Sequence, residues 1–76
     1  MLPYWQERPD LTAEVRSLMG NGEMTVYEDA PHRCFHIVRG YADEFTSVPM
    51  PWGDGVREML RRQAYIMHND QSDVEI

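Results

Sequence analysis

Three side chains able to bind a metal ion alternate along one short stretch of the sequence: His32, Cys34 and His36. Histidine and cysteine are common zinc ligands. If the stretch is a strand, these side chains share one face at steps of about 6.7 Å, so the outer two lie about 13 Å apart. One ion cannot reach both, and an adjacent pair would need further ligands, for which Glu28 and His68 are the candidates. We therefore expect no metal site, and we interpret Cys34 as a small buried group and His36 as a surface residue.

The pair Cys34 and His36 also has the residue types of a nucleophile and a general base. Covalent catalysis needs in addition a group that orients the base and donors that stabilise an oxyanion. The sequence indicates neither, so we predict a protein that is not an enzyme, with no catalytic residues and no cofactor. Anion binding at the start of the last helix is disfavoured as well, because Asp54 would occupy that position as a cap.

Acidic side chains dominate the charge of the chain. The 76 residues include 13 acidic and 7 basic groups, and the formal net charge is −6. Every basic group is an arginine. Affinity for nucleic acid relies on neutralising phosphates with basic side chains, so direct nucleic-acid binding is not expected. An acidic surface is instead attracted to basic surfaces, and proteins that bind nucleic acid are the obvious partners.

Several of these acids fall at the turns of a predicted antiparallel meander. Its second turn would bring Asp43 and Glu44 close to Glu23, while Glu28 and Asp29 would lie at the opposite end. We predict that they dock on a basic groove, where complementary charge speeds association and excludes wrong partners. The predicted contact residues, which include an aromatic anchor, are Glu23, Asp43, Glu44, Glu28, Asp29 and Tyr27. The alternative is that these acids form only a solvated face.

The elements that position these residues follow from hydrophobic spacing and turn chemistry. Two helices are predicted over residues 11–19 and 55–68, capped by Asp10 and Asp54. Alternating patterns predict three strands, over residues 23–27, 32–39 and 45–48. The expected fold class is α+β, in the order α-β-β-β-α, with a three-stranded antiparallel sheet and two helices packed on one face.

The two faces of this sheet are expected to differ. The residues predicted to face the helices are Met24, Val26, Phe35 and Ile37. The residues predicted to face outward, as a contact patch or a dimer interface, are Thr25, Tyr27, His36 and Val38.

The length predicts one small domain over residues 1–76. Residues 1–9 are expected to form an extended arm, because two prolines flank its aromatic residues Tyr4 and Trp5. These two rings are predicted to lie across the edge of the core or, alternatively, to anchor a partner. Residues 70–76 are expected to form a frayed acidic tail.

The sequence also favours an intracellular location. Cys34 is the single cysteine, which excludes an internal disulfide and fits a reducing compartment. No apolar run approaches the roughly 20 residues of a membrane span. The start has neither the basic lead nor the apolar core of a secretory signal. We therefore expect a soluble protein of the cytoplasm, in the host cell if a phage encodes it, without membrane contact.

The order α-β-β-β-α is similar to that of double-stranded RNA-binding domains. Those domains begin their last helix with a lysine-rich motif, whereas this one begins Asp54-Gly55-Val56-Arg57 in a chain without lysine. RNA binding of that type is therefore not expected. In size, acidity and simplicity the whole chain resembles the small acidic proteins with which phages disable host machinery, including anti-CRISPR proteins. This resemblance rests on no motif. It implies a stoichiometric inhibitor that occupies the DNA-binding groove of an effector complex.

The leading hypothesis is a non-enzymatic protein-binding inhibitor, whose partner is a basic host protein or nucleoprotein complex. The alternative is a structural or regulatory homodimer, built through the outward sheet face or the aromatic arm, because a small core gains stability from dimerisation. A third class is a metal-dependent site around His32, Cys34 and His36.

Overall fold

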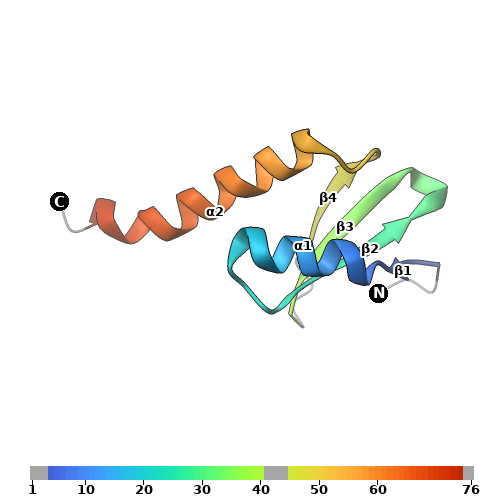
Figure 1. Cartoon of the computed structure of the whole chain (residues 1–76), viewed down its shortest axis with the longest axis horizontal. Coiled ribbons are helices and arrows are strands. Elements are labelled where there is room, and N and C mark those ends of the chain that lie inside the picture. Colours follow the sequence, from blue (N-terminus) through green and yellow to red (C-terminus); the bar gives the residue numbers. More distant parts are fainter. Residues whose placement is uncertain (1–3, 41–44, 75–76) are drawn as a thin grey trace.

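The computed structural model describes residues 4–40 and 45–74 of the chain, and the side chains as far as Ala64. It has the α+β class predicted from the sequence, with two helices and one antiparallel sheet (Figure 1). The elements in chain order are β1 (Gln6–Glu7), α1 (Pro9–Met19), β2 (Met24–Asp29), the short 3₁₀-helix η1 (Ala30–His32), β3 (Cys34–Arg39), β4 (Phe45–Pro49) and α2 (Asp54–Val74).

The sheet contains four strands in the order β1-β2-β3-β4, so the prediction of three strands was one short. The additional strand comes from the N-terminal arm, where Gln6 pairs with Glu28 and Glu7 pairs with Tyr27. A two-residue strand has no hydrophobic period that a sequence could reveal. It forms because the outer edge of β2 offers backbone groups that need partners.

Helix α1 begins two residues earlier than predicted, at Pro9, with Arg8 rather than Asp10 as its N-cap residue. Proline suits the first position of a helix, because the N–H that it lacks would have no partner inside the helix. Asp10 lies in the first turn instead, where a negative charge is favourable, and its carboxylate pairs with Arg8 at 2.9 Å. The helix ends as expected at Gly20, whose φ of 63° is left-handed.

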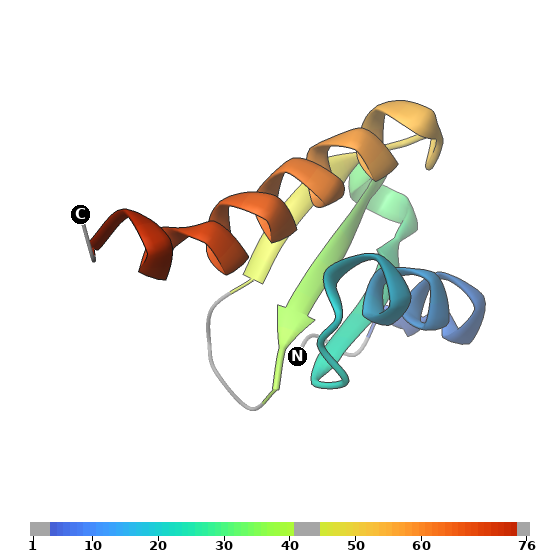
Figure 2. The ribbon, with the colours of Figure 1, turned by 60° about the vertical axis from the view of Figure 1, so that its left-hand side comes forward.

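The core lies between the sheet and both helices, which cover the same face of the sheet (Figure 2). The strand residues predicted to face the helices are all buried: Met24, Val26, Phe35 and Ile37. From the helices, Val15 of α1 and Leu60 of α2 are almost completely buried against them. Glu14 of α1 also joins the two helices, because its carboxylate accepts hydrogen bonds from Arg57 at 2.8 Å and from Trp52.

Helix α2 starts at Asp54 and continues to Val74, beyond the predicted end at His68. It therefore includes residues 70–74 of the tail that was expected to fray. Figure 1 shows its C-terminal half extending past the end of the sheet. Within the described ranges, no helix is both long enough and apolar enough to cross a membrane.

Candidate functional site

The face of the sheet opposite the helices carries most of the reactive side chains, and we call it the outer face. The pairing register places its residues in three rows across the strands. One row contains Glu7, Tyr27, His36 and Ser47, and the second contains Thr25, Val38 and Phe45. The third row contains Asp29, Cys34 and Pro49. Residues directly opposite one another in a sheet share a face, so these side chains are neighbours.

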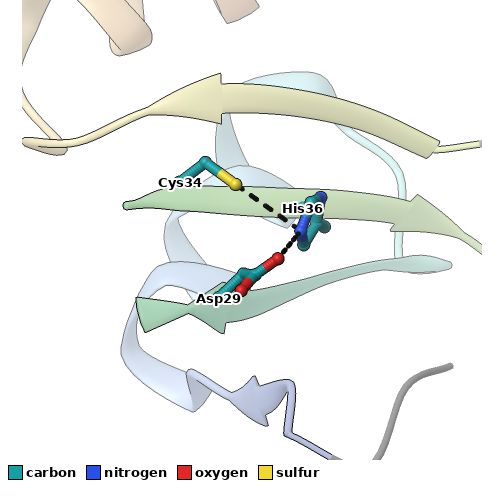
Figure 3. A group of neighbouring side chains, drawn as sticks. All are labelled: Asp29, Cys34 and His36. Carbon is teal, nitrogen blue, oxygen red and sulfur yellow. Dashed lines mark hydrogen bonds and ion pairs between the residues drawn. The ribbon is translucent and has the colours of Figure 1, made fainter. Parts of the chain in front are cut away.

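Asp29, Cys34 and His36 form a compact cluster on this face (Figure 3). Asp29 ends β2 and lies opposite Cys34, the first residue of β3. His36 Nε2 lies 2.8 Å from Asp29 Oδ2 and 3.6 Å from Cys34 Sγ. One ligand atom from each residue lies within 4.8 Å of the other two. A nitrogen, a sulfur and an oxygen atom therefore converge on one small volume.

His36 is buried, with an exposed fraction of only 7%, which corrects the expectation that it is a surface residue. The cause is Trp5 of the arm, whose ring stacks on the imidazole at a centroid distance of 3.9 Å. Phe45 approaches the same imidazole edge-on at 5.4 Å. The arm therefore brings Trp5 onto the outer face, on the opposite side of the sheet from the main core.

His32 does not belong to strand β3, as the sequence pattern suggested, but to the 3₁₀-helix η1. Its Nδ1 lies 2.9 Å from both carboxylate oxygens of Asp29. The premise that placed His32 about 13 Å from His36 is therefore wrong, since both imidazoles contact the same carboxylate. Pro31 and the Asp29 carboxylate, which accepts the His32 backbone N–H at 3.4 Å, favour this tight turn.

The environment of the cluster shifts two pKa values. Burial alone would raise the pKa of Asp29, but hydrogen bonds from His36 and His32 outweigh it and hold that pKa below its usual range. Burial, together with the nearby Asp29 charge, raises the pKa of the Cys34 thiol. Asp29 is therefore ionised and Cys34 protonated at neutral pH.

The hydrogen bonds of His36 show what the cluster can do chemically. Its Nδ1 lies 2.7 Å from Ser47 Oγ. Asp29 and Cys34 both face the other ring nitrogen, Nε2. In a nucleophile–histidine–acid triad, the acid orients the base from the nitrogen away from the nucleophile. Cys34 and Asp29 do not meet that condition, whereas three ligand types facing one point suit a metal ion.

The predicted contact residues are dispersed. Glu23 is exposed just before β2, at the end of the sheet where β3 ends, and its carbonyl accepts the Gly40 N–H at 2.8 Å. Tyr27 is half-buried on the outer face. Glu28 belongs to the helix-covered face and pairs with Arg8 at 2.6 Å.

The remaining predicted contact residues are Asp29, Asp43 and Glu44. Asp29 is buried, with an exposed fraction of 3%, so its carboxylate serves the cluster and is not accessible to a partner. Asp43 and Glu44 lie outside the described residues, and their predicted role stays a prediction.

Several residues of the outer face were not predicted as contacts. Phe45 is a large hydrophobic side chain with an exposed fraction of 52%. Tyr4, which was predicted as an alternative anchor for a partner, is 43% exposed, and its ring centroid lies 6.0 Å from that of His32 at the edge of this face. Glu7 adds an exposed carboxylate beside Tyr27. Strand alternation could have indicated Phe45, which begins the predicted third strand and lies opposite Val38 of the predicted outward set. Glu7 could be found only from its pairing with β2.

Comparison of the chain with protein-family models, with curated proteins and with solved structures finds no match.

Proposed function

We propose that the chain is a non-enzymatic protein-binding module that uses its outer face to bind a basic partner. The observation that carries the proposal is the composition of that face. It combines exposed aromatic side chains with the exposed carboxylate of Glu7, and none of its strand residues is an arginine.

The aromatic side chains supply the anchoring part of the proposed contact. Phe45 and Tyr4 are exposed, while Tyr27 and Trp5 are partly covered. Trp5 also contacts Phe45 edge-on, with ring centroids 5.4 Å apart, so part of the layer is already ordered. Large aromatic residues contribute much of the binding energy at protein interfaces. Rings that are held before binding lose less conformational entropy when the partner arrives.

The acidic side chains would select the partner in the proposed contact. Glu7 is exposed and pairs with Tyr27 in the sheet, and Glu23 is exposed just before β2; the net charge of the chain is −6. A groove that binds nucleic acid is rich in basic side chains, so it complements such a face in charge. Following the resemblance to anti-CRISPR proteins, we propose that the partner is a nucleic-acid-binding effector of the host cytoplasm and that binding blocks its access to DNA.

A homodimer is the second candidate, and a specific feature favours it. Strand β4 is an outer strand of the sheet, and Phe45 at its start is exposed. An outer strand has backbone groups that can pair with a second chain. Light scattering of the purified full chain over a range of concentrations distinguishes the two candidates. A mass of one chain throughout supports the partner-binding module, and a concentration-dependent dimer supports the homodimer.

Affinity capture from the native host, followed by mass spectrometry, tests the proposed partner. The proposal expects a nucleic-acid-binding protein whose DNA binding is lost when the chain is added. In the double variant Glu7→Arg/Glu23→Arg, affinity for that protein should fall about tenfold or more, equivalent to about 1.4 kcal/mol. The control Asp54→Arg/Glu58→Arg changes the net charge equally at exposed positions of α2.

Two results would contradict the proposal. The captured protein could continue to bind DNA normally in the presence of the chain. Alternatively, both double variants could lose affinity equally, which would show that overall charge rather than the outer face determines binding.

A further inference from the structure

Beyond partner binding, the Asp29, Cys34 and His36 cluster has a property that the proposed function does not use. It lies within eight residues that contain four side chains of metal-binding type, in the order Asp29, His32, Cys34 and His36. The tight turn of η1 brings the two ends of this stretch together, and the antiparallel pairing of β2 with β3 places Asp29 opposite Cys34. We infer that Asp29, Cys34 and His36 form a binding site for a single zinc ion.

The distances among the three ligand atoms are close to those that zinc coordination requires. Zinc–sulfur and zinc–nitrogen bonds of about 2.3 and 2.05 Å at a tetrahedral angle place the two ligand atoms about 3.6 Å apart. Cys34 Sγ and His36 Nε2 are 3.6 Å apart. The same geometry requires about 3.3 Å between a nitrogen and an oxygen ligand, compared with 2.8 Å between His36 Nε2 and Asp29 Oδ2. The third pair, Cys34 Sγ and the Asp29 oxygen, lies within 4.8 Å, whereas the same geometry requires about 3.6 Å. Side-chain rotations that separate the nitrogen from the oxygen by about half an ångström and draw the sulfur toward the oxygen would complete the set.

Neighbouring side chains hold and shield the proposed ligands. A metal-binding histidine usually donates its other ring N–H to a neighbouring acceptor, which fixes the tautomer. Ser47 Oγ, 2.7 Å from His36 Nδ1, is such an acceptor. A ligating carboxylate is in turn held by a hydrogen bond, and His32 Nδ1 holds Asp29 at 2.9 Å. Trp5 covers the His36 ring and limits its contact with water.

The charges and ligand number also fit zinc. A carboxylate and a thiolate together balance the two positive charges of the ion, and the imidazole binds in its neutral form. Binding converts the Cys34 thiol to a thiolate and releases its proton to solvent. Three protein ligands leave a fourth position for water or for an atom of a partner. The mixture of nitrogen, sulfur and oxygen favours zinc over magnesium or calcium, which prefer oxygen ligands.

Cobalt(II) and zinc titrations of the purified full chain, under reducing conditions, test this inference. Cobalt(II) should bind once per chain, with a sulfur-to-cobalt charge-transfer band in the near ultraviolet and the intense visible bands of tetrahedral coordination. Zinc should displace it, and competition with a chromogenic chelator gives the zinc affinity. Cys34→Ser should abolish the charge-transfer band. Cys34→Ser, Asp29→Asn and His36→Gln should each weaken zinc binding by more than about 100-fold, beyond the effect of losing an outer-shell group.

The control variant is Glu7→Gln, which removes an exposed carboxylate from the same sheet face outside the cluster and should bind zinc like the wild type. Metal-free thermal unfolding of each variant checks that it folds. Cys34→Ser is the most conservative of the three changes, and it keeps the test decisive if another variant unfolds. The inference is overturned if cobalt gives no charge-transfer band, if the band persists in Cys34→Ser, or if folded cluster variants bind zinc as tightly as Glu7→Gln.

Discussion

Thr12 provides the sharpest test of how helix α1 is attached to the sheet. Strand β1 pairs with only two residues of β2, so part of the outer edge of β2 needs other partners. At Val26 these partners come from the start of α1. The Val26 backbone N–H donates to Thr12 Oγ1 at 2.9 Å, and the Val26 carbonyl accepts the Arg8 N–H at 2.9 Å. Thr12 and Val26 are both buried, so water cannot replace the hydroxyl.

Replacing Thr12 by valine keeps the shape of the side chain and removes its oxygen. A buried N–H without an acceptor costs about 1–3 kcal/mol of folding free energy. A chain of 76 residues has a total stability of about 4–11 kcal/mol at typical per-residue values. Thr12→Val should therefore remove a substantial fraction of the stability. The melting temperature should fall by about 4–8 °C for each kcal/mol lost.

Urea unfolding followed by circular dichroism measures this change, and Thr12→Ser is the matched control. Serine retains the hydroxyl acceptor and loses only a buried methyl group, which is worth about 0.8 kcal/mol. We expect Thr12→Val to be less stable than Thr12→Ser. If Thr12→Val equals or exceeds the wild type in stability while Thr12→Ser is destabilised, the methyl group and not the hydrogen bond attaches the helix.

Three further changes test other parts of the structure. Hydrogen bonding to Arg57 holds the pKa of Glu14 below its usual value, so ionised Glu14 stabilises the fold fully above its unfolded-state pKa, and this stabilisation is lost as pH falls through its folded-state pKa. Glu14→Gln should therefore flatten the acid side of a stability–pH curve measured by urea unfolding, and an unchanged curve would contradict this. Leu60 is 1% exposed, so Leu60→Ala should lower the free energy of unfolding by about 2–5 kcal/mol, whereas Leu18→Ala at a half-buried position should lower it clearly less. Equal losses of this free energy in denaturant unfolding would argue against the described core. Gly40 has a φ of 59°, so Gly40→Ala should lower stability by about 1 kcal/mol, and a thermal scan showing a gain would contradict the left-handed conformation.

The regular parts of the fold could be predicted from the sequence because they depend on local patterns. Alternation placed Met24 and Val26 on the buried face of a strand, and helical spacing placed Val15 and Leu60 in the two helices. Gly20 ended the first helix as expected because few other residues adopt a left-handed conformation. These signals lie within a few residues of the positions that they describe.

The outer face could not be predicted to the same extent because its arrangement depends on contacts between distant segments. His36 is buried only because Trp5, far away in the sequence, stacks on it. His32 approaches Asp29 because an aspartate and a proline close a short turn, and the strand assumption concealed that local signal. Because His32 lies in η1 and not in the strand, the distance of about 13 Å that argued against a shared site for these side chains does not apply.

The proposed use of the outer face is tested most directly by hydroxyl-radical footprinting of the chain, alone and bound to the captured partner. Phe45 is exposed on the outer face, and Tyr4 is exposed at its edge beside His32, so both report on this face. Met59 reports on α2, where it lines a shallow hollow together with Glu58 and Arg62. The proposal predicts that the partner protects Tyr4 and Phe45 from oxidation and leaves Met59 unchanged. Protection of Met59 with unchanged oxidation of Tyr4 and Phe45 would place the contact on α2 and contradict it.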